Sequence, residues 1–293
     1  MSVELVRIPT SDGLVLDGAL HHADQIGSGA VLYLHGKGGA FYTGPGRYVP
    51  ESSEMSGVPC AHLAINMRMH DLGFSRHNAP DRPMLANTPP FPVSAGGGMW
   101  ERLAEGILDV QAAVRWLREN GAQKVFVSGK SSGGFFATQY ASTDPTLAGV
   151  IIMSPVHTHR MPFPTWFASD AERAGTVQRA REMVADGQGY ALIPLPQWYF
   201  AISAASLVER ADEPENIWVD WMPSLAAPVL MFYGDLEVDD VPVWYEGFTK
   251  SPSQQKRLVV LANADHSYIG GEQTVCAEVS RFVGEVLAGS GEW

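Results

Sequence analysis

Runs of apolar, often β-branched residues alternate with helical patterns along most of the chain. Residues 3–8 and 14–20 alternate apolar and polar positions around the turn signal at 11–13, which predicts an antiparallel hairpin. Continuous apolar runs, typical of strands buried on both faces of a sheet, follow at 30–34, 60–67, 124–128, 149–153, 229–233 and 257–261. Apolar residues at helical spacing occupy 100–120, 133–140 and 274–287. The alternation predicts an α/β fold, with a mostly parallel sheet covered by helices on both faces.

Two segments interrupt this alternation. Residues 76–98 are rich in proline and glycine, and a loop of that length within a compact domain is usually functional or mobile. The larger interruption, 155–222, has no strand alternation but contains a helical stretch and an aromatic run. We interpret it as a helical cap inserted between two core strands. The predicted organisation is a core of residues 1–154 and 223–293 with the cap between them.

Composition and charge exclude several classes of protein. Hydrophobic residues make up 45% of the 293 residues, which excludes a disordered or collagen-like chain. The net charge is −12, and no cluster of Lys and Arg forms a basic face, so we expect neither nucleic acid nor an anionic membrane as partner. Charged residues are scarce at 18%, which indicates a neutral surface that could serve as a homodimer interface.

Cysteine usage and the N-terminal segment favour a cytoplasmic protein. Cys60 and Cys276 form neither a disulfide framework nor a thiolate metal site, so we expect two buried free thiols. The first residues lack a basic region followed by an apolar run, and no apolar stretch reaches about 18 residues, the length of a membrane span.

The strongest chemical signal is Gly129-Lys130-Ser131-Ser132-Gly133, which follows a predicted strand and opens a helical pattern. This is G-x-S-x-G in the strand–turn–helix context of a nucleophile elbow. The residues two before and two after the nucleophile must have small side chains. Ser131 meets this condition, with Gly129 and Gly133 at these positions, whereas a nucleophile at Ser132 would place Lys130 at one of them. A plain Gly/Ser turn is the alternative. A phosphate-binding loop is excluded, because Lys124 occupies the position where that motif needs a glycine.

Three further segments follow predicted strands. The glycine-rich loop at 35–39 can aim a backbone N–H at a substrate oxygen and, with the N–H of Ser132, form an oxyanion hole, although a flexible turn would look the same. His266 follows the last predicted strand, where an imidazole could serve as general base. Four carboxylates that could orient this histidine follow the strand at 229–233: Asp235, Glu237, Asp239 and Asp240.

Together these segments resemble the α/β-hydrolase superfamily, in its serine-nucleophile, esterase- and lipase-like branch, over most of the chain outside the cap. The resemblance implies an eight-stranded sheet whose second strand is antiparallel, with a site at the carboxyl ends of the strands. It also implies that Ser131 is the nucleophile, that His266 is the base and that Lys37 supplies the second oxyanion N–H. Lys130 departs from the family, where many relatives carry His, Asp or Glu before the nucleophile.

The acidic loop also departs from the family pattern, being one residue longer than usual. In relatives the acid commonly lies three residues after the glycine that ends the strand, and counting from Gly234 gives Glu237. We therefore predict Glu237, with Asp239 as the first alternative and Asp240 next. Asp235 lies too close to the strand end and would brace the turn.

A serine nucleophile indicates acyl chemistry, without metal or organic cofactor. We predict a serine hydrolase that cleaves a small or medium carboxylic ester through an acyl-enzyme. The alternatives are a C–C bond hydrolase or lactonase with the same residues, and a non-catalytic ligand-binding protein of this fold.

Histidines and aromatic residues of the cap are candidates for the substrate pocket. His157 and His159 could line its rim, pack the cap or bind a metal, but no third ligand lies nearby in the sequence, so we predict no metal site. Trp166, Trp198 and the two aromatic residues that follow Trp198 either line an apolar pocket or pack the cap on the core. We select His157 and Trp198 as substrate-binding residues.

Overall fold

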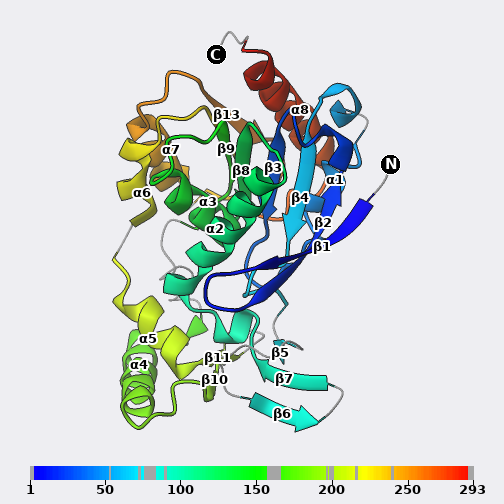
Figure 1. Cartoon of the computed structure of the whole chain (residues 1–293). Helices are drawn as coiled ribbons and strands as arrows, with labels where there is room; N and C mark the ends of the chain where they lie inside the picture. The colour runs from blue at the N-terminus through cyan, green and yellow to red at the C-terminus, as the bar shows by residue number, and fades with distance from the viewer. Residues whose placement is uncertain are drawn as a thin grey trace.

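A computed structural model describes residues 3–52, 54–71, 74–75, 84–88, 91–156, 166–195, 197, 201–214, 217–238 and 241–289. Its central sheet has eight strands in the order β1-β2-β4-β3-β8-β9-β12-β13 (Figure 1). The strands are β1 (Val3–Pro9), β2 (Val15–His21), β3 (Ala30–Leu34), β4 (Ala61–Ile65), β8 (Val125–Lys130), β9 (Gly149–Met153), β12 (Val229–Gly234) and β13 (Lys256–Leu261). Strand β2 is antiparallel to both neighbours and all other pairs are parallel. The expected eight-stranded, mostly parallel sheet is confirmed.

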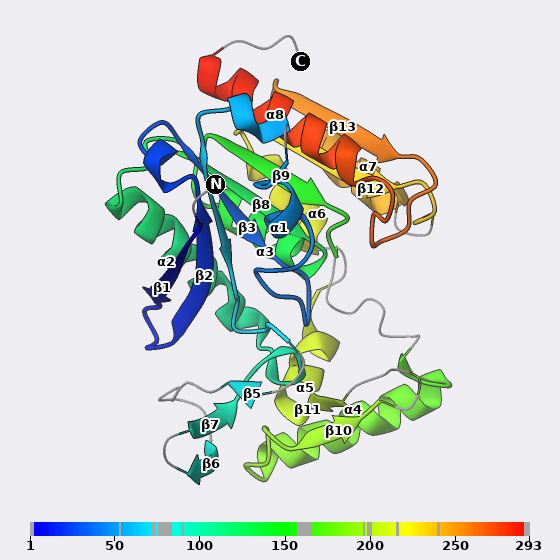
Figure 2. The ribbon, with the colours of Figure 1, turned by 90° about the vertical axis from the view of Figure 1, so that its right-hand side faces the viewer.

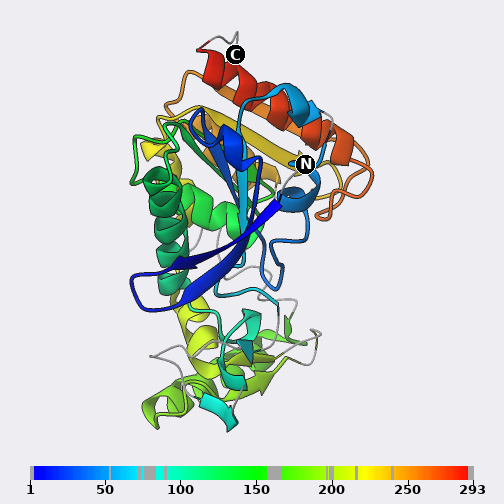
Figure 3. The same cartoon turned by 45° about the vertical axis from the view of Figure 1, so that its right-hand side comes forward.

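Helices cover both faces of this sheet. The described helices, including α4 and α5 at one end of the core, are α1 (Pro45–Tyr48), α2 (Leu103–Glu119), α3 (Ser132–Ala141), α4 (Asp170–Ala185), α5 (Ala204–Asp212), α6 (Ile217–Trp221), α7 (Val241–Lys250) and α8 (Glu272–Ala288), with short 3₁₀ turns η1 (Ala23–Gln25), η2 (Glu54–Gly57), η3 (Gly98–Trp100) and η5 (Met222–Ser224). Figures 2 and 3 show α2 and α8 on opposite sides of the sheet.

The central strand β3 explains why both faces are buried. Its side chains alternate, so Leu32 and Leu34 pack into the cluster that contains α2 and α3, while Val31 and Tyr33 pack into the cluster that contains α8. All five residues of the strand are buried, as the continuous apolar run predicts. Cys60 and Cys276 are buried free thiols, also as expected.

The segment between β9 and β12 is not purely helical. It contains α4 and α5 together with a two-stranded ladder of β10 (Leu192–Pro194) and β11 (Ala201–Ser203). These elements share an apolar cluster that includes Trp166, Ile202 and Leu207. In Figures 1 and 2 this unit lies at one end of the core, together with a small antiparallel sheet.

The small sheet lies where the sequence predicts only a loop. It consists of β5 (Phe74–Ser75), β6 (Met84–Thr88) and β7 (Phe91–Ala95), in the order β5-β7-β6. Five prolines among residues 74–95, and the glycines that follow at 96–98, obscure the strands in the sequence. A three-stranded antiparallel sheet nevertheless accepts a proline at positions that donate no ladder hydrogen bond, and Pro92 lies within β7 opposite Asn87.

Helix α6 packs on the core, although it falls within the range predicted as cap. Trp218 is fully buried in the core cluster, and its indole N–H donates to Thr138 Oγ1 of α3 at 2.8 Å. A Cβ atom at Gly247 of α7 would lie 2.1 Å from the Trp218 ring, so only glycine allows this approach. The boundaries of the cap stay a prediction.

Buried histidines link the stability of the core to pH. His62 on β4 is fully buried and its Nδ1 lies 3.2 Å from the Tyr33 hydroxyl. Burial, helped by nearby His22 and His21, lowers the pKa of His62 to about 3. A histidine kept neutral by the fold contributes its full stability above its unfolded pKa of about 6.5, and that contribution is lost as the pH falls below this value.

We expect the free energy of unfolding to fall between pH 8 and pH 5, with His62 contributing about 1–2 kcal/mol of the decrease. Urea unfolding of the wild type and of His62→Gln at both pH values measures this share, because the other titrating groups are common to the two proteins. If both lose the same free energy on acidification, the assignment to His62 is wrong.

Candidate active site

Ser131 lies at the sharp turn between β8 and α3. Its φ of 56° and ψ of −123° are unusual for a residue with a side chain, and its N–H donates to the Met153 carbonyl at 2.9 Å. A backbone conformation of this kind is strained and persists only where the surrounding structure enforces it. The predicted strand–turn–helix context is present around this serine.

The glycines on either side of Ser131 explain why this turn can form. A Cβ atom at Gly129 would lie 2.1 Å from the Gly133 carbonyl oxygen. One at Gly133 would lie 2.3 Å from the carbonyl oxygen of Leu34, at the end of β3. Both positions therefore require glycine, and the turn is pressed against the end of the neighbouring strand.

His266 is held by a carboxylate from the loop after β12. Glu237 Oε1 lies 2.7 Å from His266 Nδ1, and the other oxygen, Oε2, accepts hydrogen bonds from Gly234 N–H at 2.8 Å and from Ser154 Oγ at 2.5 Å. The Glu237 side chain is 7% exposed and that of His266 is 51% exposed. The acid is thus buried and fixed, while the imidazole reaches solvent.

The other candidate acids are placed differently or not described. Asp235 accepts a hydrogen bond from Ala264 N–H at 3.2 Å and joins the turns after β12 and β13. Asp239 and Asp240 lie outside the described residues.

A buried hydroxyl chain supports the carboxylate. Ser154 Oγ, which donates to Glu237, lies 2.5 Å from the Tyr268 hydroxyl. Because Ser154 has a single proton to give, Tyr268 is the donor in that contact. Burial raises the pKa of Tyr268 well above its ordinary value, so the phenol stays protonated. The sequence alone did not point to either residue. Ser154 directly follows the predicted strand at 149–153, and Tyr268 lies two residues after His266.

Lys130, the residue before Ser131 that departs from the family pattern, lies over the ring of Tyr268. Its ammonium lies 4.8 Å from the centre of the Tyr268 ring. Burial lowers the pKa of Lys130, while the negative charges of Glu237 and Asp265 oppose this shift. The lysine therefore places a positive charge beside the carboxylate that holds His266.

The loop after β3 lies directly against Ser131. A Cβ atom at Gly36 would lie 3.0 Å from the Ser131 Cβ atom. His35 braces this loop: its Nδ1–H donates to the Gly36 carbonyl at 2.7 Å, and its Nε2 accepts from Met67 N–H at 2.9 Å. Burial lowers the pKa of His35 to about 4, which keeps the ring neutral and able to fill both roles. The sequence analysis gave His35 no role.

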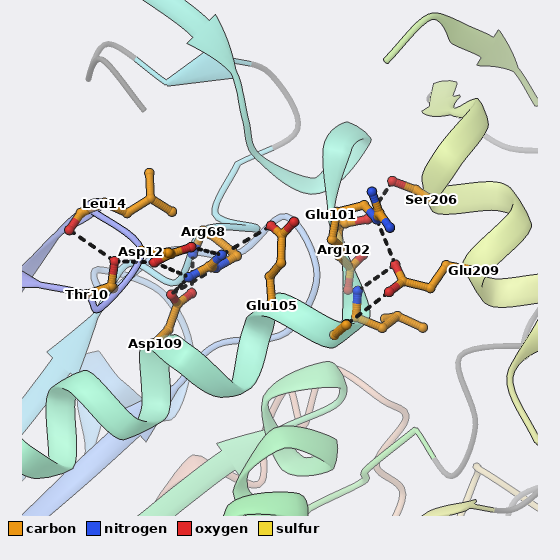
Figure 4. Close-up of polar contacts among 12 residues, drawn as sticks. Thr10, Asp12, Leu14, Arg68, Glu101, Arg102, Glu105, Asp109, Ser206 and Glu209 are labelled. Atoms are coloured by element: carbon orange, nitrogen blue, oxygen red, sulfur yellow. Dashed lines mark hydrogen bonds and ion pairs between the residues drawn. The ribbon is translucent and has the colours of Figure 1, made fainter. Parts of the chain in front are cut away.

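The segment that carries Met67 is itself anchored by a buried ion pair (Figure 4). Arg68 Nε and Nη2 donate to Asp109 Oδ1 of α2 at 2.9 and 2.8 Å, and the Arg68 backbone N–H donates to Asp109 Oδ2 at 2.7 Å. Arg68 Nη1 also reaches Asp12 Oδ2 at 2.8 Å. The carbonyl of Met69, the residue after Arg68, accepts from Gly38 N–H at 3.2 Å, so this anchor supports the loop at 35–39.

One cavity of about 860 Å³ brings these groups together. Of the residues predicted for the site, Ser131, Ser132, Lys37, Glu237 and His266 all line it. Much of the remaining lining is apolar and includes Phe41, Met153, Trp166, Leu236 and Trp244. Two predicted substrate-binding residues, His157 and Trp198, lie outside the described residues.

In the described part of the chain, no group of three or more His, Cys, Asp or Glu side chains is arranged to hold a metal ion; the His157/His159 pair falls outside that part. Within the same ranges, no helix combines the length and apolar character that a membrane span requires.

One family model matches about a third of the chain. A family model described as serine aminopeptidase, S33, matches residues 94–187. A search among curated proteins finds no significant match.

Solved structures match over nearly the whole chain. DcsB, in complex with its substrate analogue, has a TM-score of 0.71 at 14% identity, covering 98% of this chain and all of its own. The α/β hydrolase GrgF from Penicillium sp. sh18 has a TM-score of 0.69 at 15% identity, with coverage of 98% and 100%. Est1E from Butyrivibrio proteoclasticus has a TM-score of 0.63 at 15% identity, with coverage of 97% and 99%. At such identities the likeness concerns the fold.

Proposed function

We propose that this chain, which has the α/β-hydrolase fold, is a serine hydrolase that cleaves small or medium carboxylic esters through an acyl-enzyme. One observation carries the proposal: a strained, glycine-flanked Ser131 lines the same cavity as His266, whose Nδ1 lies 2.7 Å from the buried Glu237. Nucleophile, base and orienting acid are the three parts that activation of a serine requires.

The first half of the reaction forms the acyl-enzyme. His266 Nε2 takes the proton of Ser131 Oγ as that oxygen attacks the ester carbonyl carbon, and the carbonyl π electrons move onto the oxygen. Glu237 fixes the imidazole with its Nδ1–H toward the carboxylate and stabilises the imidazolium. The backbone N–H groups of Lys37 and Ser132 bind the oxyanion. The C–O bond to the alcohol then breaks, and the alcohol leaves with the proton from His266.

The second half repeats this chemistry with water. His266 takes a proton from a water molecule, whose oxygen attacks the acyl carbon. Collapse of the tetrahedral intermediate returns the proton to Ser131 Oγ and releases the carboxylic acid. All of these steps use side chains and amides that line the cavity.

The shape and lining of the cavity support an ester with an apolar acyl or aryl group. A volume of about 860 Å³ lies within the usual range for small-molecule sites. The apolar lining suits a carbon chain or ring rather than a highly charged group. Est1E, one of the similar structures, has been solved with ferulic acid bound, which is an aromatic carboxylic acid.

The first test is a substrate panel with two serine variants. p-Nitrophenyl esters of graded acyl length are compared with lactones and vinylogous diketo acids, because lactonase and C–C hydrolase activity would use the same residues. We expect Ser131→Ala to lower kcat for the preferred ester by several orders of magnitude, up to about 10⁶. Ser132→Ala should cost little, because its backbone N–H is retained.

Correct folding of both variants is checked by circular dichroism and thermal unfolding. Loss of activity in Ser132→Ala with activity retained in Ser131→Ala would overturn the assignment of the nucleophile. A wild type that turns over lactones or diketo acids far faster than esters would overturn the substrate class and leave the nucleophile standing.

The second test addresses the acid. Glu237→Gln keeps the shape of the side chain but favours the wrong imidazole tautomer, and losses of about 10⁴ in kcat are known for such a change in a serine triad. Asp235→Asn is the matched control on the same loop and should keep kcat within about threefold. Asp239→Asn tests the first alternative. A folded Glu237→Gln enzyme with near-normal kcat, beside an inactive Asp239→Asn, would transfer the role to Asp239.

A further inference from the structure

A buried carboxylate connects the proposed oxyanion loop to the cap. Lys37 Nζ donates to the Gly98 carbonyl and to Glu101 Oε2, both at 2.6 Å. The same oxygen, Glu101 Oε2, accepts from Arg210 Nη2 of α5 at 2.5 Å. We name Lys37, Glu101 and Arg210 the Glu101 cluster. Its three members come from the loop after β3, the segment between η3 and α2, and the cap.

The Glu101 cluster is shielded from water. The side chains of Glu101 and Arg210 are 1% and 3% exposed, and that of Lys37 is 15% exposed. The Arg210 guanidinium also lies 5.5 Å from the centre of the Trp166 ring in the cap. Charge-assisted hydrogen bonds in such surroundings are strong and geometrically strict, so a shift of one member displaces the others.

Further contacts hold helix α5 on the same segment (Figure 4). Ser206 Oγ donates to the Glu101 carbonyl at 2.5 Å. The Glu209 carboxylate accepts from the N–H groups of Leu103 and Ala104, at 2.8 and 3.0 Å, in the first turn of α2. The packing of α5 against this segment is therefore coupled to the position of Glu101, and through Glu101 to Lys37.

We propose that Glu101 is a positioning residue: by holding the Lys37 side chain when α5 is seated, it directs the Lys37 backbone N–H toward the oxyanion. The inference rests on the proposed function, in which that N–H binds the oxyanion. It assigns to the cap a part in transition-state stabilisation, beyond covering the substrate. Arg210 acts through Glu101 in the same way.

The charge state of Lys37 gives the proposal a pH signature. Burial lowers the pKa of Lys37 to about 8, with Glu101 opposing the shift and Arg210 adding to it. As the pH rises through this value, Lys37 loses its proton and its ion pair with Glu101. We expect kcat of the wild type to fall as the pH rises above about 8. Lys37→Arg, which stays charged, should keep its kcat to higher pH.

The test compares variants by their affinity for a transition-state analogue. An alkyl trifluoromethyl ketone forms a hemiketal when Ser131 Oγ adds to its carbonyl carbon, with the serine proton passing to His266 and the new oxyanion entering the oxyanion hole. The matching methyl ketone, which adds far less readily, reports ground-state binding. Inhibition constants for both ketones and the kcat and KM for one p-nitrophenyl ester are measured for each protein.

We expect Lys37→Met, which keeps the backbone N–H, and Glu101→Gln to lower kcat about 10- to 100-fold and to weaken trifluoromethyl ketone binding by a similar factor. KM and methyl ketone affinity should change less than about threefold. Asp212→Asn is the control: it breaks the ion pair between Asp212 of α5 and Arg181 of α4, which lies within the cap, and should leave all four values near wild type.

Each outcome is decisive. If Lys37→Met keeps wild-type kcat and trifluoromethyl ketone affinity, Glu101 does not position the oxyanion donor and the inference is overturned. Equal weakening of both ketones would indicate a purely structural role and would also overturn it. Should Glu101→Gln fail to fold, Lys37→Met carries the test, because Glu101 keeps its bond to Arg210. A wild type that binds the two ketones equally would instead refute the proposed function itself.

Discussion

The site depends on one close approach between two pieces of backbone. Where β8 turns into α3, the chain passes so near the end of β3 that Gly133 has no room for a Cβ atom against the Leu34 carbonyl oxygen. The same turn drives Ser131 to a φ of 56° and presses it against Gly36. Ser131, the glycine-rich loop at 35–39 and the first turn of α3 therefore meet at one edge of the sheet. A residue larger than glycine at position 133 would push them apart.

The parallel order of the sheet brings the remaining groups to that edge. Strands β9, β12 and β13 follow β8 in this order across the sheet, so Ser154, Glu237 and His266 come after neighbouring strand ends although they lie far apart in the sequence. Their polar atoms are tied together by hydrogen bonds, and His266 alone of the three is half exposed. A rigid, buried acid with a solvent-facing imidazole is the arrangement that a general base requires.

Local sequence patterns predicted the core strands, the main helices and the glycine-flanked serine, because each is specified by residues close together in the chain. Counting from Gly234 also singled out Glu237, the carboxylate that contacts His266. Contacts between residues far apart in the sequence could not be predicted in this way. In the sequence, Asp109 is one polar residue of a predicted helix, and only the fold brings it to Arg68. No local pattern pairs Glu101 with Lys37 or Arg210. The strands at 84–88 and 91–95 were missed because they are short and prolines lie before, between and within them.

The proposed nucleophile is Ser131, and covalent labelling distinguishes it from every other serine. The folded protein is treated with a fluorophosphonate near neutral pH, digested, and examined by tandem mass spectrometry with fragment ions that separate Ser131 from Ser132. We expect one adduct per chain, on Ser131, formed in step with loss of ester hydrolysis. An adduct on Ser132 or elsewhere, or full inhibition with Ser131 unmodified, would contradict it.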